Sequence, residues 1–119
     1  MIRLGGKVFL NDATGDADIG VSHGDADDDV YELARKHTEK GFRAAYCPQV
    51  SIDDGQRLRD IRAAFAAENI IIAEVGAWRN MYHPDPDAAR RERDLVVESL
   101  AVAEEVGARC AITVVGSYA

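Results

Sequence analysis

Residues 67–75 read Ala67-Glu68-Asn69-Ile70-Ile71-Ile72-Ala73-Glu74-Val75, and in this stretch an amphipathic helix gives way at once to a short apolar strand. The same change occurs at Glu39-Lys40-Gly41-Phe42 and at Glu105-Val106-Gly107-Ala108. Gly and Asn tolerate the left-handed backbone conformation that ends a helix. Alternating helices and strands of this kind predict right-handed βα units in a parallel sheet. Because ligands of such sheets bind at the carboxyl ends of the strands, site residues are sought there.

The whole chain of 119 residues is predicted to form a single α/β domain with four parallel strands and three helices, in the order β-α-β-α-β-α-β. The strands are predicted at the apolar runs 2–9, 42–47, 70–75 and 109–115. The run Ile70–Ala73 has no polar alternation, which is typical of a parallel strand covered by helices.

Each predicted helix has an apolar face and a recognisable start. The first spans residues 27–40, the second opens with the capping box Ser51-Ile52-Asp53-Asp54, and the third opens at Asp85-Pro86 and reaches about Val106. The residues predicted to face inward are Val30, Leu33, Ala34, His37, Leu58, Ile61, Phe65, Leu95, Val96, Leu100 and Ala103. Between the first strand and the first helix, residues 11–29 are predicted to form an acidic loop, whose spacing does not match a calcium-binding EF-hand.

Composition narrows the classes of function. The formal net charge of −7 argues against nucleic-acid binding, which depends on clustered Lys and Arg. No run of about 18 apolar residues and no signal-peptide pattern is present, so we expect no membrane partner. Cys47 and Cys110 fall in predicted buried strands without metal-binding spacing, which favours a reduced, cytoplasmic protein.

The candidate ligand-binding residues follow the second and third predicted strands. Trp78 offers a flat apolar wall for stacking on a sugar, and polar groups for hydroxyls, phosphate or carboxylate come from Gln49, Arg79, Asn80 and His83. The alternative is a loop in which Trp78 caps the core.

Three further residues invite a chemical role. Glu74 lies in an apolar strand, either as a functional acid in a barrel mouth or, as we favour, as the structural partner of Arg43 or Arg109. Cys47 has no His and Asp arrangement to activate it and is predicted to be a buried structural residue. His37, on the apolar face of a helix, is predicted to pack in the core.

The segment from Tyr46 to Ser117 resembles the amino-terminal half of the sugar phosphate isomerase/epimerase family, the xylose isomerase-like TIM barrels. The residues that carry this resemblance are Gly76-Ala77-Trp78-Arg79-Asn80-Met81, Pro84-Asp85-Pro86 and the run Ala101–Ala111.

The resemblance implies that this chain is half of a (βα)8 TIM barrel with the sequential strand order 1-2-3-4. The whole eight-stranded barrel of the family binds a divalent metal ion (Mn, Mg, Co or Zn) and isomerises or epimerises a sugar or sugar phosphate by proton transfer. Trp78 and Asn80 would then lie on the substrate side, and His83 is similar in position to a His of the related metal-dependent apurinic endonucleases. The family's metal ligands lie largely in the second half of the barrel, so this chain does not supply an evident set.

Four parallel strands do not close a barrel, and they leave an unpaired edge. Three outcomes stay open: two copies combine as a homo-oligomer, a carboxyl-terminal half is missing, or the sheet adopts an open, flavodoxin-like order around a phosphorylated ligand. The leading functional hypothesis is a sugar isomerase/epimerase that is incomplete in this chain alone. The alternative is a non-catalytic sugar-binding or self-assembling half-barrel module.

Overall fold

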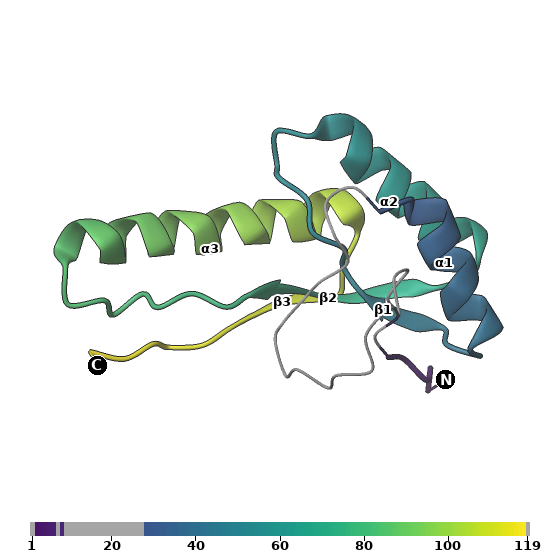
Figure 1. The fold of residues 1–119 in the computed structure, drawn as a ribbon, viewed down its shortest axis with the longest axis horizontal. Helices are drawn as coiled ribbons and strands as arrows, with labels where there is room; N and C mark the ends of the chain where they lie inside the picture. Colours follow the sequence, from purple (N-terminus) through teal and green to yellow (C-terminus); the bar gives the residue numbers. More distant parts are fainter. Residues whose placement is uncertain (1, 7, 9–27, 119) are drawn as a thin grey trace.

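The computed structural model describes residues 2–6, 8 and 28–118, and its helices and strands alternate along the chain (Figure 1). The elements in order are α1 (Val30–Glu39), β1 (Ala44–Tyr46), α2 (Gly55–Ala67), β2 (Ile71–Ala77), α3 (Pro86–Val106) and β3 (Cys110–Thr113). The predicted loop over residues 11–29 falls, up to residue 27, outside the described residues. No helix in the described part of the chain has the length and apolar character needed to cross a membrane.

The three strands form one parallel sheet in the order β1-β2-β3, which confirms the predicted α/β class with parallel strands. The predicted strand over residues 2–9 is reduced, in its described residues, to an isolated parallel bridge between Gly5 and Ala44. At this bridge the carbonyl of Leu4 accepts the N–H of Arg43 at 2.7 Å. A Cβ on Gly5 would lie 2.8 Å from the Ala44 Cβ, so this close approach requires glycine. Among the described residues, regular pairing therefore joins three strands, and the predicted four-strand order is not shown.

The three helix-to-strand junctions adopt the backbone conformation that the sequence predicted. Gly41, Asn69 and Gly107 have φ values of 80°, 54° and 71°. Each positive φ ends a helix and turns the chain back toward the sheet, where the next strand begins within three residues.

The start of α3 follows the sequence, whereas α1 begins at Val30, three residues after the predicted start at residue 27. Asp29 accepts two backbone N–H groups at the start of α1, and Asp85 does the same ahead of Pro86 in α3. For α2 the cap is Asp54 and not Ser51, so the predicted start is three residues early. The Ser51 carbonyl accepts the N–H of Asp54 at 3.1 Å, which makes residues 51–54 a turn that leads into the helix.

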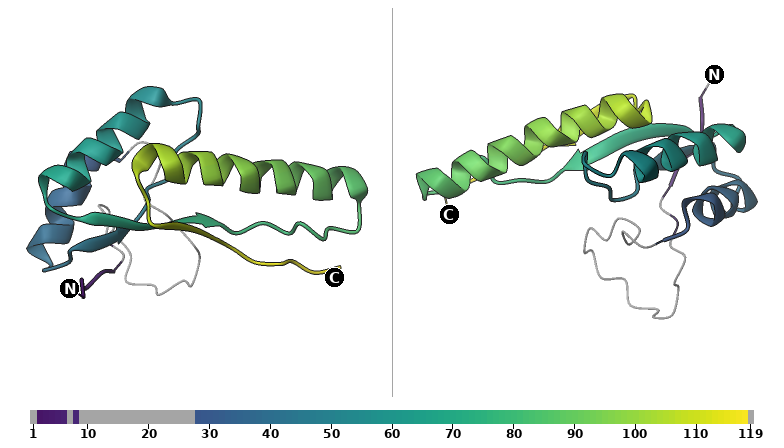
Figure 2. Two further views of the ribbon diagram at one scale, coloured as in Figure 1. Left: turned by 180° about the vertical axis from the view of Figure 1, so that it is seen from behind. Right: turned by 90° about the horizontal axis from the view of Figure 1, so that it is seen from above.

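The core lies between the sheet and the helices. α2 and α3 pack on one face of the sheet and α1 packs against α2, which leaves the opposite face without a described helix (Figures 1 and 2). The predicted inward faces of α1 and α2 are buried. The largest fully buried side chains of the core are Phe65 and Ile61 of α2. On α3 the prediction for Leu100 is wrong, because that side chain is 55% exposed. The buried face of α3 instead comprises Ala89, Val102, Ala103 and Val106.

His37 packs in this core as the sequence predicted. Its side chain is 3% exposed, its Nδ1 lies 2.8 Å from the Leu33 carbonyl, and its ring meets Phe65 edge-on at 5.5 Å. Burial lowers the pKa of His37 below its ordinary value, against the opposing effect of hydrogen bonds to the carbonyls of Leu33 and Gly6. The neutral imidazole is therefore the form that the fold prefers.

This preference makes the stability of the fold depend on pH. Above the ordinary histidine pKa of 6.5 both the folded and unfolded states are neutral at His37, and its contribution is fully present. As the pH falls below 6.5, the unfolded state takes up a proton first, so the free energy of unfolding decreases. Urea unfolding of the wild type from pH 7.5 to pH 5 measures this loss.

The variant His37→Phe provides the comparison. It lacks the bond to Leu33 and should be less stable than the wild type by about 1–2 kcal/mol at pH 7.5. The gap should narrow as the pH falls, because Phe cannot be protonated. A constant difference in the free energy of unfolding between pH 7.5 and pH 5 would contradict the burial of a neutral His37.

Candidate functional site

A cavity of about 610 Å³ opens at the carboxyl ends of β1 and β2. Its wall comes from the loop Cys47–Ser51, from the end of β2 with Trp78 and Arg79 beyond it, and from one face of α3 over residues 95–102. The cavity lies where the topology of a parallel sheet places ligands, and its volume is in the range of small-molecule sites, about 300–1,000 Å³.

Hydrogen bonds fix the two loops that form the mouth. The N–H of Cys47 donates to the Glu74 carbonyl at 2.9 Å, which holds the chain beyond β1 beside β2. The Glu98 carboxylate on α3 accepts the N–H of Ile52 at 3.3 Å and the hydroxyl of Ser51 at 3.4 Å. Glu98 therefore links α3 to the turn before α2 across the cavity.

Three of the five predicted site residues line this cavity, namely Gln49, Trp78 and Arg79. Trp78 is 43% exposed, so part of the indole is buried and part faces solvent. Among the described residues, the guanidinium of Arg79 has no hydrogen-bond or ion-pair partner. An apolar ring beside an uncommitted cation suits a ligand that has a nonpolar face and a negative group.

Asn80 is turned away from the cavity and holds the chain after β3. Its Oδ1 accepts the N–H of Ser117 at 2.8 Å and that of Tyr82 at 3.2 Å, while its Nδ2 donates to the Ser117 carbonyl at 2.8 Å. A Cβ on Gly116, which has φ 100°, would clash with the Asn80 Oδ1. The Asn80 side chain thus bonds the backbone N–H and carbonyl of Ser117, as a neighbouring strand would.

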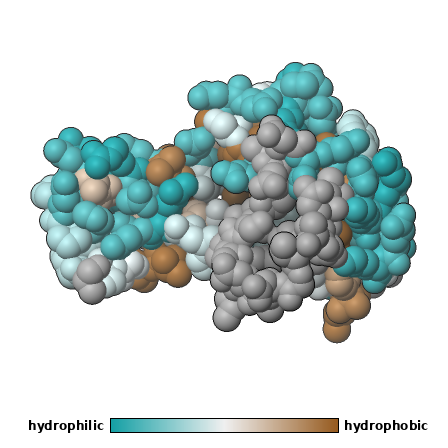
Figure 3. Space-filling model, viewed as in Figure 1, coloured by the Kyte–Doolittle hydropathy of each residue, from teal (hydrophilic) through white to brown (hydrophobic). Residues whose placement is uncertain are grey.

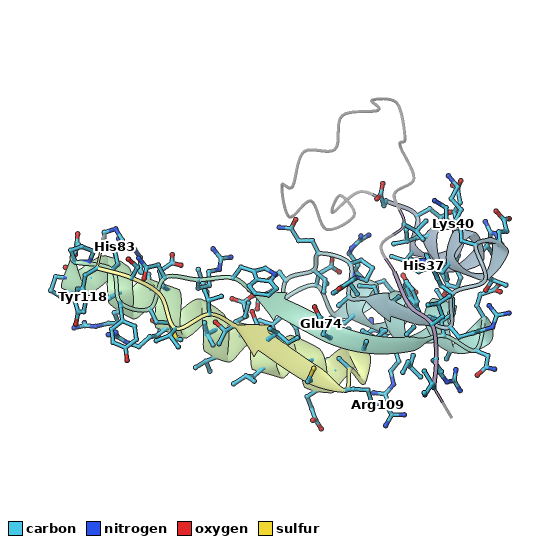
Figure 4. The ribbon with its side chains drawn as sticks, turned by 90° about the horizontal axis from the view of Figure 1, so that it is seen from below. His37, Lys40, Glu74, His83, Arg109 and Tyr118 are labelled. Atoms are coloured by element: carbon cyan, nitrogen blue, oxygen red, sulfur yellow. The ribbon has the colours of Figure 1, made fainter. Side chains whose placement is uncertain are left out.

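His83 lies at the far end of α3, near Tyr118 and remote from Glu74 (Figure 4). Its Nδ1 accepts the N–H of Asp85 at 3.1 Å. Asp85 caps α3, and the N–H groups of Ala88 and Asp87 lower the pKa of its carboxyl. His83 therefore supports the start of α3, and the structure does not bring Asn80 and His83 into the cavity with Arg79.

Sequence reasoning missed the polar residues that α3 and its neighbouring loop bring to the cavity. These are Ser51, Glu98 and Ser99. The available signal was the position of Glu98 and Ser99 between Leu95 and Val102 on one helix face, because polar residues inside an apolar stripe need a partner.

Glu74 lies on the face of the sheet that no described helix covers (Figure 4). A register shift between Ala45 and Tyr46 pairs Tyr46 with Glu74, and the buried Val75 faces the helices. The favoured ion pair of Glu74 with Arg43 or Arg109 is wrong. Among the described residues Glu74 forms no such pair, because the surface beside it is open enough to solvate the carboxylate.

The described residues do not fit the divalent metal that the family resemblance implies. No group of three or more His, Cys, Asp or Glu side chains converges among them in a way that could hold an ion. The carboxylate at the cavity, Glu98, already accepts two hydrogen bonds from the protein. No step of a reaction is therefore derived through a metal.

No family model, no curated protein and no solved structure matches this chain.

The two cysteines have opposite environments. Cys47 is 7% exposed and its thiol donates to the Pro48 carbonyl at 3.2 Å, which confirms the prediction of a buried structural residue. Burial raises the pKa of Cys47 to about 12. Cys110, predicted to be buried, is exposed instead, because its pairing with Glu74 places it on the uncovered face at the edge of the sheet.

A thiol-specific reagent should therefore modify Cys110 and leave Cys47 unmodified in the folded protein. At pH 8 a thiol with a pKa near 12 is ionised in about one molecule in 10,000. Mass mapping after brief iodoacetamide treatment identifies the labelled residue, and Cys110→Ser should remove the label. Rapid modification of Cys47 without denaturant would contradict the structure.

The clamp between Asn80 and the tail predicts a local effect. Asn80→Ala removes three hydrogen bonds to backbone groups and should speed hydrogen exchange at the Ser117 amide by about tenfold, the effect of roughly 1.4 kcal/mol. Gly116→Ala should act similarly because of its clash with Asn80. Amide exchange in the core of α2 should be unchanged, and equal acceleration in both places would mean that the variant loosens the whole fold.

Proposed function

We propose that this chain is a non-catalytic binding module for a sugar or sugar phosphate, and that it has the form of an arc of a TIM barrel. The observation that carries the proposal is the cavity at the carboxyl ends of β1 and β2, where Trp78 and Arg79 stand side by side in sequence and Gln49 faces them from the neighbouring loop.

The half-barrel form has three supports. The strands run parallel in sequential order, the helices that contact the sheet share one face, and residues 2–6 run parallel to β1 at the Gly5–Ala44 bridge. A sequential order agrees better with an arc of a barrel than with an open flavodoxin-like sheet, in which the first strand is internal.

The chemistry of the cavity favours a phosphorylated sugar over a free sugar. The indole of Trp78 can stack on the C–H face of a sugar ring, and amide and hydroxyl groups from Gln49, Ser51 and Ser99 can bind its hydroxyls. The Arg79 guanidinium supplies a charge-assisted bond to phosphate.

Isomerase or epimerase chemistry remains the second candidate, and it is supported by the family resemblance of Gly76–Met81. Metal-assisted proton transfer on a sugar needs a set of acidic and His ligands, which the described residues do not gather. A binding role needs nothing beyond the cavity, and for this reason it is preferred.

Trp78 is the single tryptophan of the chain, so its fluorescence reports directly on the cavity. Titration with ribose 5-phosphate should change the emission intensity with saturation, whereas inorganic phosphate should give a weaker response. Arg79→Gln should raise the dissociation constant by about 10- to 100-fold, the effect of losing a hydrogen bond to a charged group.

Arg90→Gln is the matched control, because Arg90 is an exposed residue of α3 outside the cavity. It should leave the dissociation constant unchanged. An equal rise of the dissociation constant in both variants would attribute the effect to net charge alone. An emission spectrum that is unaltered at 10 mM ribose 5-phosphate would refute the sugar-phosphate site.

The catalytic alternative is tested with the same protein. After incubation with Mn²⁺ and sugar phosphate in D2O, a binding module leaves the carbon-bound protons of the ligand in place. Deuterium at the carbon next to the carbonyl, seen by NMR, would replace the binding proposal with the catalytic one.

A further inference from the structure

The cavity at the ends of β1 and β2 contains two opposite charges that do not pair with each other. Of the described residues in its wall, Arg79 beyond β2 and Glu98 on α3 are the charged ones. Neither side chain forms an ion pair within the described part of the chain, although both line the same cavity. Opposite charges that share a cavity without meeting leave space between them for a ligand that contacts both.

The rest of the wall gives these two charges little competition. Most of its residues are apolar, and they include Pro48, Val50, Val75 and Val102. Figure 3 shows apolar surface over the middle of α3 within a face that is otherwise largely hydrophilic. Beside apolar side chains a charge is screened less than in open water, so each charge here discriminates more strongly among ligand groups.

The Glu98 carboxylate keeps one of its oxygens for a ligand. Its Oε1 accepts both the N–H of Ile52 at 3.3 Å and the hydroxyl of Ser51 at 3.4 Å. Its Oε2 accepts no hydrogen bond from the described residues. Because a carboxylate offers acceptor positions on both oxygens, the bonds that hold Glu98 in place leave Oε2 able to accept from a ligand.

Ser99 adds a second acceptor to the α3 side of the cavity. Its hydroxyl donates to the Leu95 carbonyl at 2.9 Å, one turn earlier in the helix. A hydroxyl has one proton, so with that proton committed the Ser99 oxygen can only accept. The Ser51 hydroxyl is likewise committed to Glu98. The α3 side thus presents acceptors and a negative charge, whereas the Arg79 guanidinium can only donate.

We propose that the cavity selects a sugar phosphate whose ring carries a protonated amino group. The phosphate accepts hydrogen bonds from Arg79, and the ammonium group donates to Glu98 Oε2 and to the Ser99 hydroxyl. An ammonium group has three donors and no acceptor, which matches a wall that only accepts. It also supplies a counter-ion to a partly buried carboxylate that has none among the described residues. This inference rests on the proposed binding of a sugar phosphate and specifies the class of sugar.

Titration with glucosamine 6-phosphate and with glucose 6-phosphate at pH 7, followed by the emission of Trp78, tests the inference. The two ligands differ at carbon 2, where an ammonium group takes the place of a hydroxyl. The wild type should bind glucosamine 6-phosphate at least tenfold more tightly, the effect of a hydrogen bond between charged groups. N-acetylglucosamine 6-phosphate, in which the nitrogen is neutral, should bind no more tightly than glucose 6-phosphate. Equal affinities for the amino sugar and for glucose 6-phosphate would overturn the inference and leave the proposed function standing.

Glu98→Gln removes the charge and keeps the shape of the side chain. Its amide oxygen can still accept the N–H of Ile52, while its NH2 group faces the ligand as a donor. The ratio of the two dissociation constants should therefore fall from at least ten to about one. Because both ligands are measured on the same variant, a general loss of stability does not imitate this change.

Glu104→Gln is the matched control, since Glu104 is an exposed residue of α3 outside the cavity and the change in charge is the same. It should keep the wild-type ratio. A Glu98→Gln protein that retains the preference for the amino sugar, or a Glu104→Gln protein that loses it, would contradict the inference. An emission that responds to none of the three ligands would refute the sugar-phosphate site itself, and this inference with it.

Discussion

The rest of the structure depends on the parallel pairing of β2 with both of its neighbours. β2 is the only described strand with a partner on each side, and its helix-facing residues Ile72 and Val75 belong to the core that α2 and α3 cover. The shift in register between Ala45 and Tyr46 changes which face the following residues occupy, so Val75 faces the helices and Glu74 faces away. The direction of β2 also carries Trp78 and Arg79 out at the carboxyl edge. β2 alone thus positions residues of the core, the Glu74 carboxylate on the uncovered face of the sheet, and the wall of the cavity.

The local features of the fold could be predicted from the sequence because they depend on neighbouring residues. Asn69 and Gly107 end helices through their tolerance of positive φ, and Asp85 caps a helix through bonds to residues two and three positions ahead. The start of α2 was misplaced because Ser51 and Asp54 are both good caps, and only the turn between them decides which one is used. The exposure of Leu100 and Cys110 could not be predicted, since Leu100 lies on the exposed flank of α3 and Cys110 in the edge strand β3. The periodicity of a helix or strand does not say where a sheet ends.

The structure brings together the predicted site residues that topology places at neighbouring strand ends, and it separates those that are close only in sequence. Gln49 and Trp78 line one cavity because the ends of parallel neighbouring strands meet. Asn80 lies only two residues beyond Trp78, yet its side chain binds the backbone of Ser117, a contact across 37 positions of the chain. Glu98 is far from Ile52 in the sequence but accepts its N–H in the fold. Its place opposite the loop Cys47–Ser51 depends on how α3 crosses the sheet. A polar residue within an apolar stripe is a signal for such a contact, but it does not identify the partner.

Asn80 connects the wall of the cavity to the chain that follows β3. That residue follows Trp78 and Arg79 and holds the tail that continues from β3. A contact that immobilises the tail at Ser117 therefore also restrains the segment that carries the cavity wall. Ordering the wall in advance lowers the entropic cost of binding a ligand, so the hydrogen bonds between Asn80 and Ser117 should favour binding in the cavity without touching the ligand.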